Sequence, residues 1–230
     1  MWTFGSDSTP VTGTAATATP NAPGVPWNRG DLLLALFGEG FGSHTISPIA
    51  GWTDLSPHIN VTSSLYVFGK LATATNDPMP TATYSGSTNF WCYSVAFAGA
   101  SSTLVLDSAK GDRATNSVST IPGLASTPTP SMDNCLGIWW GGRNKTTTSN
   151  GATLSTSNPN YVFQKQLVQL GSGVDLAFLY WIQTTATANA PTSVTSSISD
   201  PTTQSAKMMN FFIQPPTPMA ADDLMGQAWL

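Results

Sequence analysis

The chain contains 230 residues, which suits one large β domain or two small ones. Apolar residues make up 40% of the sequence, enough to build a core, and this composition excludes wholesale disorder. Charged residues make up 9%, against roughly 25% in most soluble domains. The net charge is −4, with eight Lys and Arg residues in all. Because phosphate binding requires clustered basic residues, this composition argues against a nucleic-acid partner.

The first residues, MWTFGSDSTP, have neither the basic region nor the apolar run of a secretion signal. No segment reaches the roughly 18 apolar residues of a membrane span. We therefore expect no signal peptide, no transmembrane segment and no membrane partner. Cys92 and Cys135 lie in apolar runs and are expected to be buried free thiols. A disulfide between neighbouring strands is the alternative.

The chain begins with a segment rich in Thr, Ala, Pro and Gly, residues 1–27. Its prolines favour an extended backbone, so we expect an extended N-terminal arm, or a first strand. A turn at residues 28–31 then leads into the apolar run Leu32–Phe37. This run is too short for a helix and is typical of a strand buried on both faces.

Further short runs rich in β-forming residues follow, separated by Gly and Pro turns. In residues 90–97 the aromatic and apolar side chains Trp91, Tyr93, Val95 and Phe97 alternate with smaller ones, which indicates a strand with one well-buried side. No stretch shows the periodicity of an amphipathic helix over three turns. The sequence therefore predicts an all-β fold, a β-sandwich or jelly roll of antiparallel strands. The other expected strands are residues 64–71, 81–85, 135–140, 174–183 and 208–213, and residues 161–163 with 166–168 are expected as a strand or hairpin arm.

Two halves of the predicted sandwich resemble each other. The segment from Leu65 to Pro80 aligns without gaps on the segment from Leu176 to Pro191, at an offset of 111 positions. We interpret this as an internal duplication, although two halves of a sandwich that obey one pattern would also align. The expected organisation is an N-terminal arm (1–27), a sandwich (28–214) with halves at about 28–103 and 130–214, and a C-terminal arm (215–230).

The sequence contains few residues suited to catalysis, metal binding or phosphate binding. His44 and His58 are expected in loops, and neither has the partners that a metal site requires. The run Gly38–Gly42 lacks the following helix of a phosphate-binding loop. The aspartates are scattered over turns and strand ends. We therefore expect no catalytic residue, no metal site and no cofactor.

The remaining candidates are aromatic and apolar side chains. Trp27 and Trp52 fall in predicted loops, where they could stack on a sugar, whereas the tryptophans within strands are expected in the core. The terminal segments carry apolar residues that would be buried by docking onto a neighbouring subunit or onto the chain's own sandwich. These candidate assembly residues are Trp2, Phe4, Met219, Leu224, Met225, Trp229 and Leu230.

The order of these segments resembles that of structural proteins of tailed bacteriophages and related prophages, over residues 20 to 216. The resemblance is carried by a Pro-rich start, Gly30–Ala35, Gly51–Thr53, an aromatic strand ending in Lys70–Ala72, Thr81–Tyr84, Phe97–Ala100 and Asn210–Pro215. It implies a virion protein that is assembled in the bacterial cytoplasm, such as a capsid decoration protein or a head or tail fibre component. It implies no catalytic residues. The segment after Pro216 departs from the pattern and is a candidate attachment segment.

The sequence therefore favours a non-enzymatic structural component of a bacteriophage virion, held by sheet-edge contacts and terminal arms. Its expected partners are the major capsid or tail subunits and other copies of itself, as a trimer. The alternative is a glycan-binding adhesion module of a tail or head fibre that recognises host sugars through the loops with Trp27 and Trp52 and through the Gly141–Pro159 segment. A glycoside hydrolase or lyase on the same sandwich is a third hypothesis.

Overall fold

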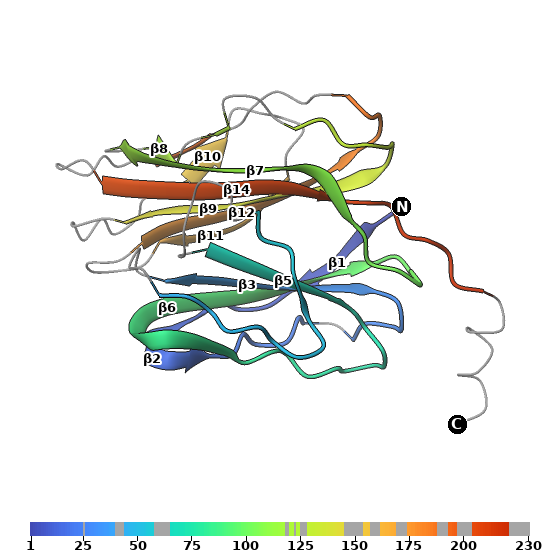
Figure 1. Ribbon diagram of the computed structural model, residues 1–230, viewed down its shortest axis with the longest axis horizontal. Coiled ribbons are helices and arrows are strands. Elements are labelled where there is room, and N and C mark those ends of the chain that lie inside the picture. Colours follow the sequence, from blue (N-terminus) through green and yellow to red (C-terminus); the bar gives the residue numbers. More distant parts are fainter. Residues whose placement is uncertain are drawn as a thin grey trace.

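All regular elements in the described part of the chain are β-strands (Figure 1). The computed structural model describes residues 1–24, 26–39, 44–57, 65–117, 120–121, 123–124, 128–144, 154–156, 162–168, 174–187, 193–196 and 204–220. The pairings between these strands are antiparallel. The structure thus confirms the predicted all-β, antiparallel fold.

The first sheet has six strands in the order β1-β6-β3-β5-β4, and β2 also pairs with β6. The 17-residue strand β6 is long enough for both partners. Its first part, from Ala82 to Cys92, pairs with β2, and its last part, from Val95 to Ala98, pairs with β1. The strands are β1 (Thr3–Asp7), β2 (Val11–Ala18), β3 (Leu32–Glu39), β4 (Thr53–Asp54), β5 (Leu65–Leu71) and β6 (Ala82–Ala98).

The second sheet has five strands in the order β11-β12-β9-β14-β7, and a small third sheet has the order β10-β13-β8. Figure 1 shows the first two sheets as stacked layers, with strands of the small sheet above the second. The strands of the second sheet are β7 (Leu106–Ser117), β9 (Cys135–Asn144), β11 (Val162–Val168), β12 (Val174–Gln183) and β14 (Gln204–Ile213). Those of the small sheet are β8 (Thr120–Ile121), β10 (Leu154–Thr156) and β13 (Val194–Ser196).

The main core lies between the two large sheets, because one apolar cluster contains alternate residues from both. Leu32, Leu34 and Leu36 of β3 contribute from the first sheet, and Leu136 and Ile138 of β9 from the second. The predicted inward face of β6 is confirmed, since its four alternating residues belong to this cluster. They are Trp91, Tyr93, Val95 and Phe97.

Each large sheet is also covered on its outer face. The small sheet contributes Ile121 and Val194 to a cluster on the outside of the second sheet. Connecting segments cover the outside of the first sheet, where they bury Leu33 and Phe37. All residues of β3 are therefore buried, and the predicted strand with two buried faces is confirmed.

The two large sheets share one strand order relative to the chain. In the first, β3 lies between β6 and β5, and in the second, β9 lies between β14 and β12. In the first sheet, β1 and β2 precede the central strand β3 in the chain and pair with β6. In the second sheet, β7 precedes the central strand β9 and pairs with β14. In the first sheet, β4 lies in the connection from β3 to β5 and pairs with β5. In the second sheet, β11 lies in the connection from β9 to β12 and pairs with β12. The predicted halves, about 28–103 and 130–214, and their origin by duplication stay predictions.

The structure corrects the predicted N-terminal arm. Residues 3–18 form β1 and β2, two strands of the first sheet rather than an arm that extends from it. The physical reason is that β6 offers its unpaired edge along 17 residues, and the backbone groups of the N-terminal segment hydrogen-bond to it. At the other end of the chain, residues 215–220 are described, and residues 221–230 of the predicted C-terminal arm lie outside the described part.

Candidate functional site

Trp2 and Phe4, two predicted assembly residues, pack against their own chain. The Trp2 side chain is buried in the main core, and its Nε1 donates a hydrogen bond to the carbonyl oxygen of Gln214 at 2.8 Å. The Phe4 ring stacks on Tyr180, with ring centroids 5.4 Å apart, and meets Phe97 edge to face. Both aromatic side chains therefore join the two sheets of one molecule.

The C-terminal segment is fixed to the body by hydrogen bonds. Gln214 donates from its backbone N–H to the carbonyl oxygen of Val105 at 2.9 Å, and from Nε2 to Ser131 Oγ at 3.4 Å. Thr217 donates from its backbone N–H to Ser101 Oγ at 2.9 Å. Met219 is half-buried. The other predicted assembly residues, Leu224, Met225, Trp229 and Leu230, lie outside the described residues.

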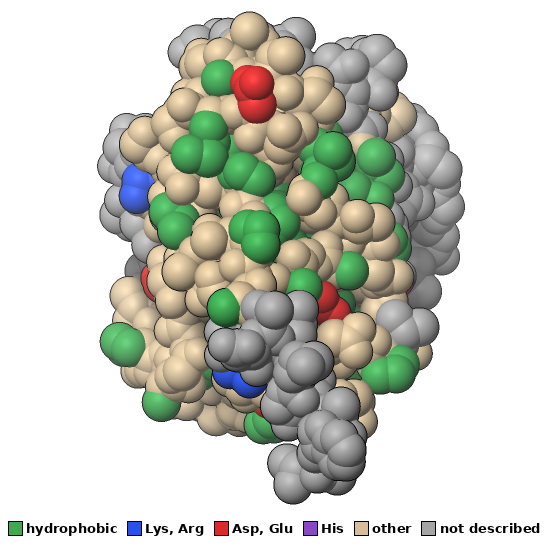
Figure 2. Space-filling view, turned by 90° about the vertical axis from the view of Figure 1, so that its right-hand side faces the viewer, with side chains coloured by type: hydrophobic (Ala, Val, Ile, Leu, Met, Phe, Trp, Pro, Cys, Tyr) green, Lys and Arg blue, Asp and Glu red, His purple; other side chains and the backbone are tan. Residues whose placement is uncertain are grey.

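Three exposed apolar residues are, or directly adjoin in sequence, the hydrogen-bond partners of Gln214. Four large apolar side chains are exposed among the described residues: Met1 (65%), Val105 (41%), Met132 (40%) and Val162 (45%). The backbone N–H of Gln214 donates to the carbonyl oxygen of Val105. Met132 and Met1 are the sequence neighbours of Ser131 and Trp2, the other two hydrogen-bond partners of Gln214. We call Met1, Val105 and Met132 the terminal patch. Figure 2 faces the side where the N-terminus and the C-terminal segment emerge, and shows few charged side chains there.

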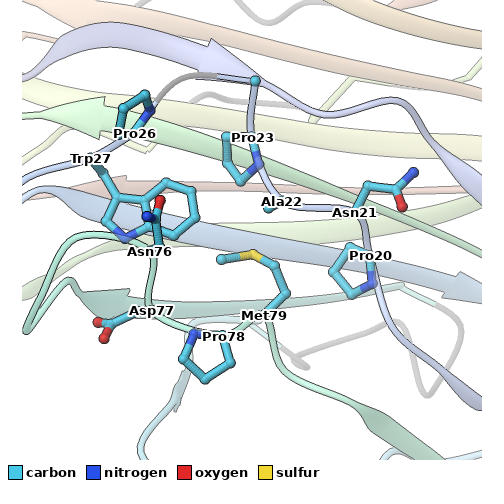
Figure 3. A pocket seen from close by; sticks show the side chains of 11 residues that line it. Pro20, Asn21, Ala22, Pro23, Pro26, Trp27, Asn76, Asp77, Pro78 and Met79 are labelled. Atoms are coloured by element: carbon cyan, nitrogen blue, oxygen red, sulfur yellow. The ribbon is translucent and has the colours of Figure 1, made fainter.

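A pocket of about 530 Å³ lies on the outer side of the first sheet (Figure 3). Two connections line it: residues 20–24 with 26–27, between β2 and β3, and residues 76–79, between β5 and β6. Trp27 lines the pocket but is only 4% exposed, because it packs on Leu33 and Ala96. Half-buried Trp52 packs against the same cluster without lining the pocket. The structure therefore brings the two predicted glycan-facing tryptophans together, while glycan contact stays a prediction.

Asp77, at the edge of this pocket, is held in place by its neighbours. Its Oδ2 accepts the backbone N–H of Thr73 at 2.7 Å and lies 3.2 Å from Lys70 Nζ. Burial acts to raise the pKa of Asp77, but the hydrogen bonds from Thr73 and the charge of Lys70 outweigh it, so the pKa lies below its usual value. The carboxylate thus stays ionised, and Lys70 balances its charge.

A second polar group, missed at the sequence level, contains a buried carboxylate and a histidine. Glu39 is fully buried at the end of β3, and its Oε2 lies 2.8 Å from His44 Nδ1 and accepts a hydrogen bond from Thr88 Oγ1 at 3.2 Å. A Glu five residues before a His was the available signal. His58 and Gly40–Gly42 lie outside the described residues. The described residues contain no group of three or more His, Cys, Asp or Glu suited to a metal ion.

The two cysteines are free and buried, as predicted. Burial raises the pKa of the Cys92 thiol to about 12 and that of the Cys135 thiol to about 11, where the charge of Asp107 adds to the effect. Cys135 also donates to the carbonyl oxygen of Met132 at 3.3 Å. Both thiols are therefore protonated, unreactive groups at neutral pH.

We expect both thiols to resist modification in the native protein. At pH 8 a disulfide reagent should modify neither Cys92 nor Cys135 within minutes, and should modify both in concentrated guanidinium chloride. Because the folded pKa values are raised, the stability that the thiols contribute is present below about pH 9 and is lost as the pH rises toward 11 and 12. Rapid modification of the folded protein would contradict this burial.

Scans of protein-family models, curated proteins and solved structures found no match to this chain. In the part of the chain that the structure describes, no helix is long and apolar enough to cross a membrane.

Proposed function

We propose that the chain is a non-enzymatic structural component of a bacteriophage virion, a capsid decoration or accessory protein. The terminal patch is the observation that carries this proposal. It consists of three exposed apolar residues, Met1, Val105 and Met132, which are, or adjoin in sequence, the hydrogen-bond partners of Gln214. The resemblance of residues 20–216 to phage structural proteins supports the same role.

Physical chemistry favours association at this patch. Exposed apolar surface is stabilised when a partner covers it, by about 25 cal/mol for each Å² removed from water. Charge that would keep copies apart is scarce, since charged residues make up 9% of the chain. Val162, the fourth exposed apolar residue, begins the edge strand β11, where backbone pairing with a neighbour would add a strand. The assembly that we propose is a homotrimer that contacts capsid or tail subunits.

Replacing both Val105 and Met132 with glutamate tests the patch. We expect self-association to weaken by about tenfold or more, because like charges that meet in an interface cost several kcal/mol. Light scattering on the size-exclusion peak measures the oligomer, and mass spectrometry of purified particles measures incorporation. Thr12→Glu, at an exposed position on β2, is the matched control. The proposal fails if the wild-type chain is both monomeric and absent from the particles.

Two further variants separate the contacts. Val162→Glu tests the β11 edge without changing the patch. A chain that ends at Ala220 keeps every residue that the structure describes and tests residues 221–230. If only this shortened chain loses its place on the particle, attachment depends on the C-terminal segment and the role assigned to the patch is wrong.

A further inference from the structure

The pocket beside Trp27 has preformed walls. Pro20, Pro23 and Pro26 stand in one connection and Pro78 in the other, and each proline ring restricts its backbone. Gly24 extends this wall. Its backbone N–H donates to the carbonyl oxygen of Asp7 at 3.1 Å, and this hydrogen bond anchors the first connection to β1. A ligand would therefore meet a shape that exists before it binds, and the volume of about 530 Å³ lies within the usual range for small-molecule sites.

One side of the pocket is lined by apolar side chains, several of which contain rings. Figure 3 shows Met79 extending toward the indole of Trp27, with Pro20 and Pro23 nearby in the other connection. Trp27 is held by the sheet beneath it, and Met79 packs against the same cluster. These groups form a fixed floor for the apolar face of a small molecule.

The rim provides polar groups without net charge. Asn76 is exposed, and its side-chain amide makes no hydrogen bond within the described part of the chain, so it can donate and accept. Asn21 is held by a hydrogen bond from its Nδ2 to the carbonyl oxygen of Thr9 at 3.0 Å. The charge of Asp77 is balanced by Lys70 at 3.2 Å. An ionic ligand would find no unbalanced charge here.

We propose that this pocket binds one residue of a neutral sugar. A pyranose ring combines an apolar C–H face, for the Met79 and proline floor, with hydroxyl groups at its rim, for the amide of Asn76. A proline-rich peptide fits less well, because proline has no N–H to donate to the side-chain oxygen of Asn76, whereas a sugar hydroxyl both donates and accepts. Binding here does not involve the terminal patch.

The test is ligand-observed NMR by saturation transfer from the full chain. The probes are glucose, galactose, mannose and N-acetylglucosamine at millimolar concentration, with glucuronate as the charged comparison and a proline-rich peptide as the other ligand class. We expect saturation of at least one neutral sugar and a weaker signal from glucuronate. Ala22→Trp, which fills the pocket from an exposed position, should abolish the signal. Asn76→Gly should weaken it at least fivefold, because it removes the amide while glycine tolerates the positive φ of 65°.

Ala16→Trp adds the same side chain at an exposed position on β2 outside the pocket and should leave the signal unchanged. Thermal unfolding of each variant shows whether it is folded. The proposal is overturned if no neutral sugar gives a signal, if Ala22→Trp leaves the signal intact while folded, or if only the peptide binds.

Discussion

Replacing Trp2 with alanine is expected to lower the free energy of unfolding by about 3 to 5 kcal/mol. The indole is fully buried in the core between the sheets, and its Nε1 donates to the carbonyl oxygen of Gln214. Removing it leaves a cavity and an unpaired carbonyl at the point where the two ends of the chain meet. Chemical denaturation monitored by fluorescence and circular dichroism would measure the change.

Thr3→Ala is the control, because Thr3 is exposed on the same strand and its loss should change stability by no more than about 0.5 kcal/mol. This pair of variants also separates two roles for Trp2. If Trp2→Ala left stability unchanged and instead broke up an oligomer, Trp2 would be an assembly residue and its place in the core would be wrong.

Replacing Gly38 with alanine is expected to lower the free energy of unfolding by about 3 kcal/mol, the upper end of the usual cost of overpacking. A Cβ at this position would lie 1.9 Å from Cε2 of Trp91. Trp91 is fully buried and cannot move aside without disturbing the main core. The same denaturation experiment measures the effect.

Gly24→Ala is the matched control, since its Cβ would make an ordinary contact of 3.7 Å with the carbonyl oxygen of Asp7. We expect this change to be nearly neutral. Equal stability of the two variants would show that Trp91 does not pack over Gly38 as described.

The buried strands could be predicted from sequence because their patterns are local. The apolar run Leu32–Phe37 between turn residues is explained only by a strand covered on both sides. The alternation from Trp91 to Phe97 fixes which face of β6 points inward. In each case neighbouring residues carry the information, and the structure agrees.

The N-terminal strands and the candidate sites depend on distant residues. Nothing near Trp2 in the sequence indicates Gln214, and the Thr- and Ala-rich β2 has a largely exposed pattern that does not distinguish a strand from an arm. The pocket likewise forms only when the connection that contains Trp27 meets the loop that contains Asn76. Long-range backbone pairing decides these positions, and local preference does not encode it.

The strand order has a consequence for synthesis of the protein on the ribosome. All six strands of the first sheet lie within residues 1–98, so this sheet can form as soon as β6 has emerged. The second sheet is different, because its last strand, β14, lies between β7 and β9. Until β14 emerges, β7 lacks the strand that joins it to the sheet, and the inward leucines of β3 lack much of their cover. The nascent chain thus exposes an apolar sheet face until β14 has emerged, and a chaperone would protect the chain at this stage.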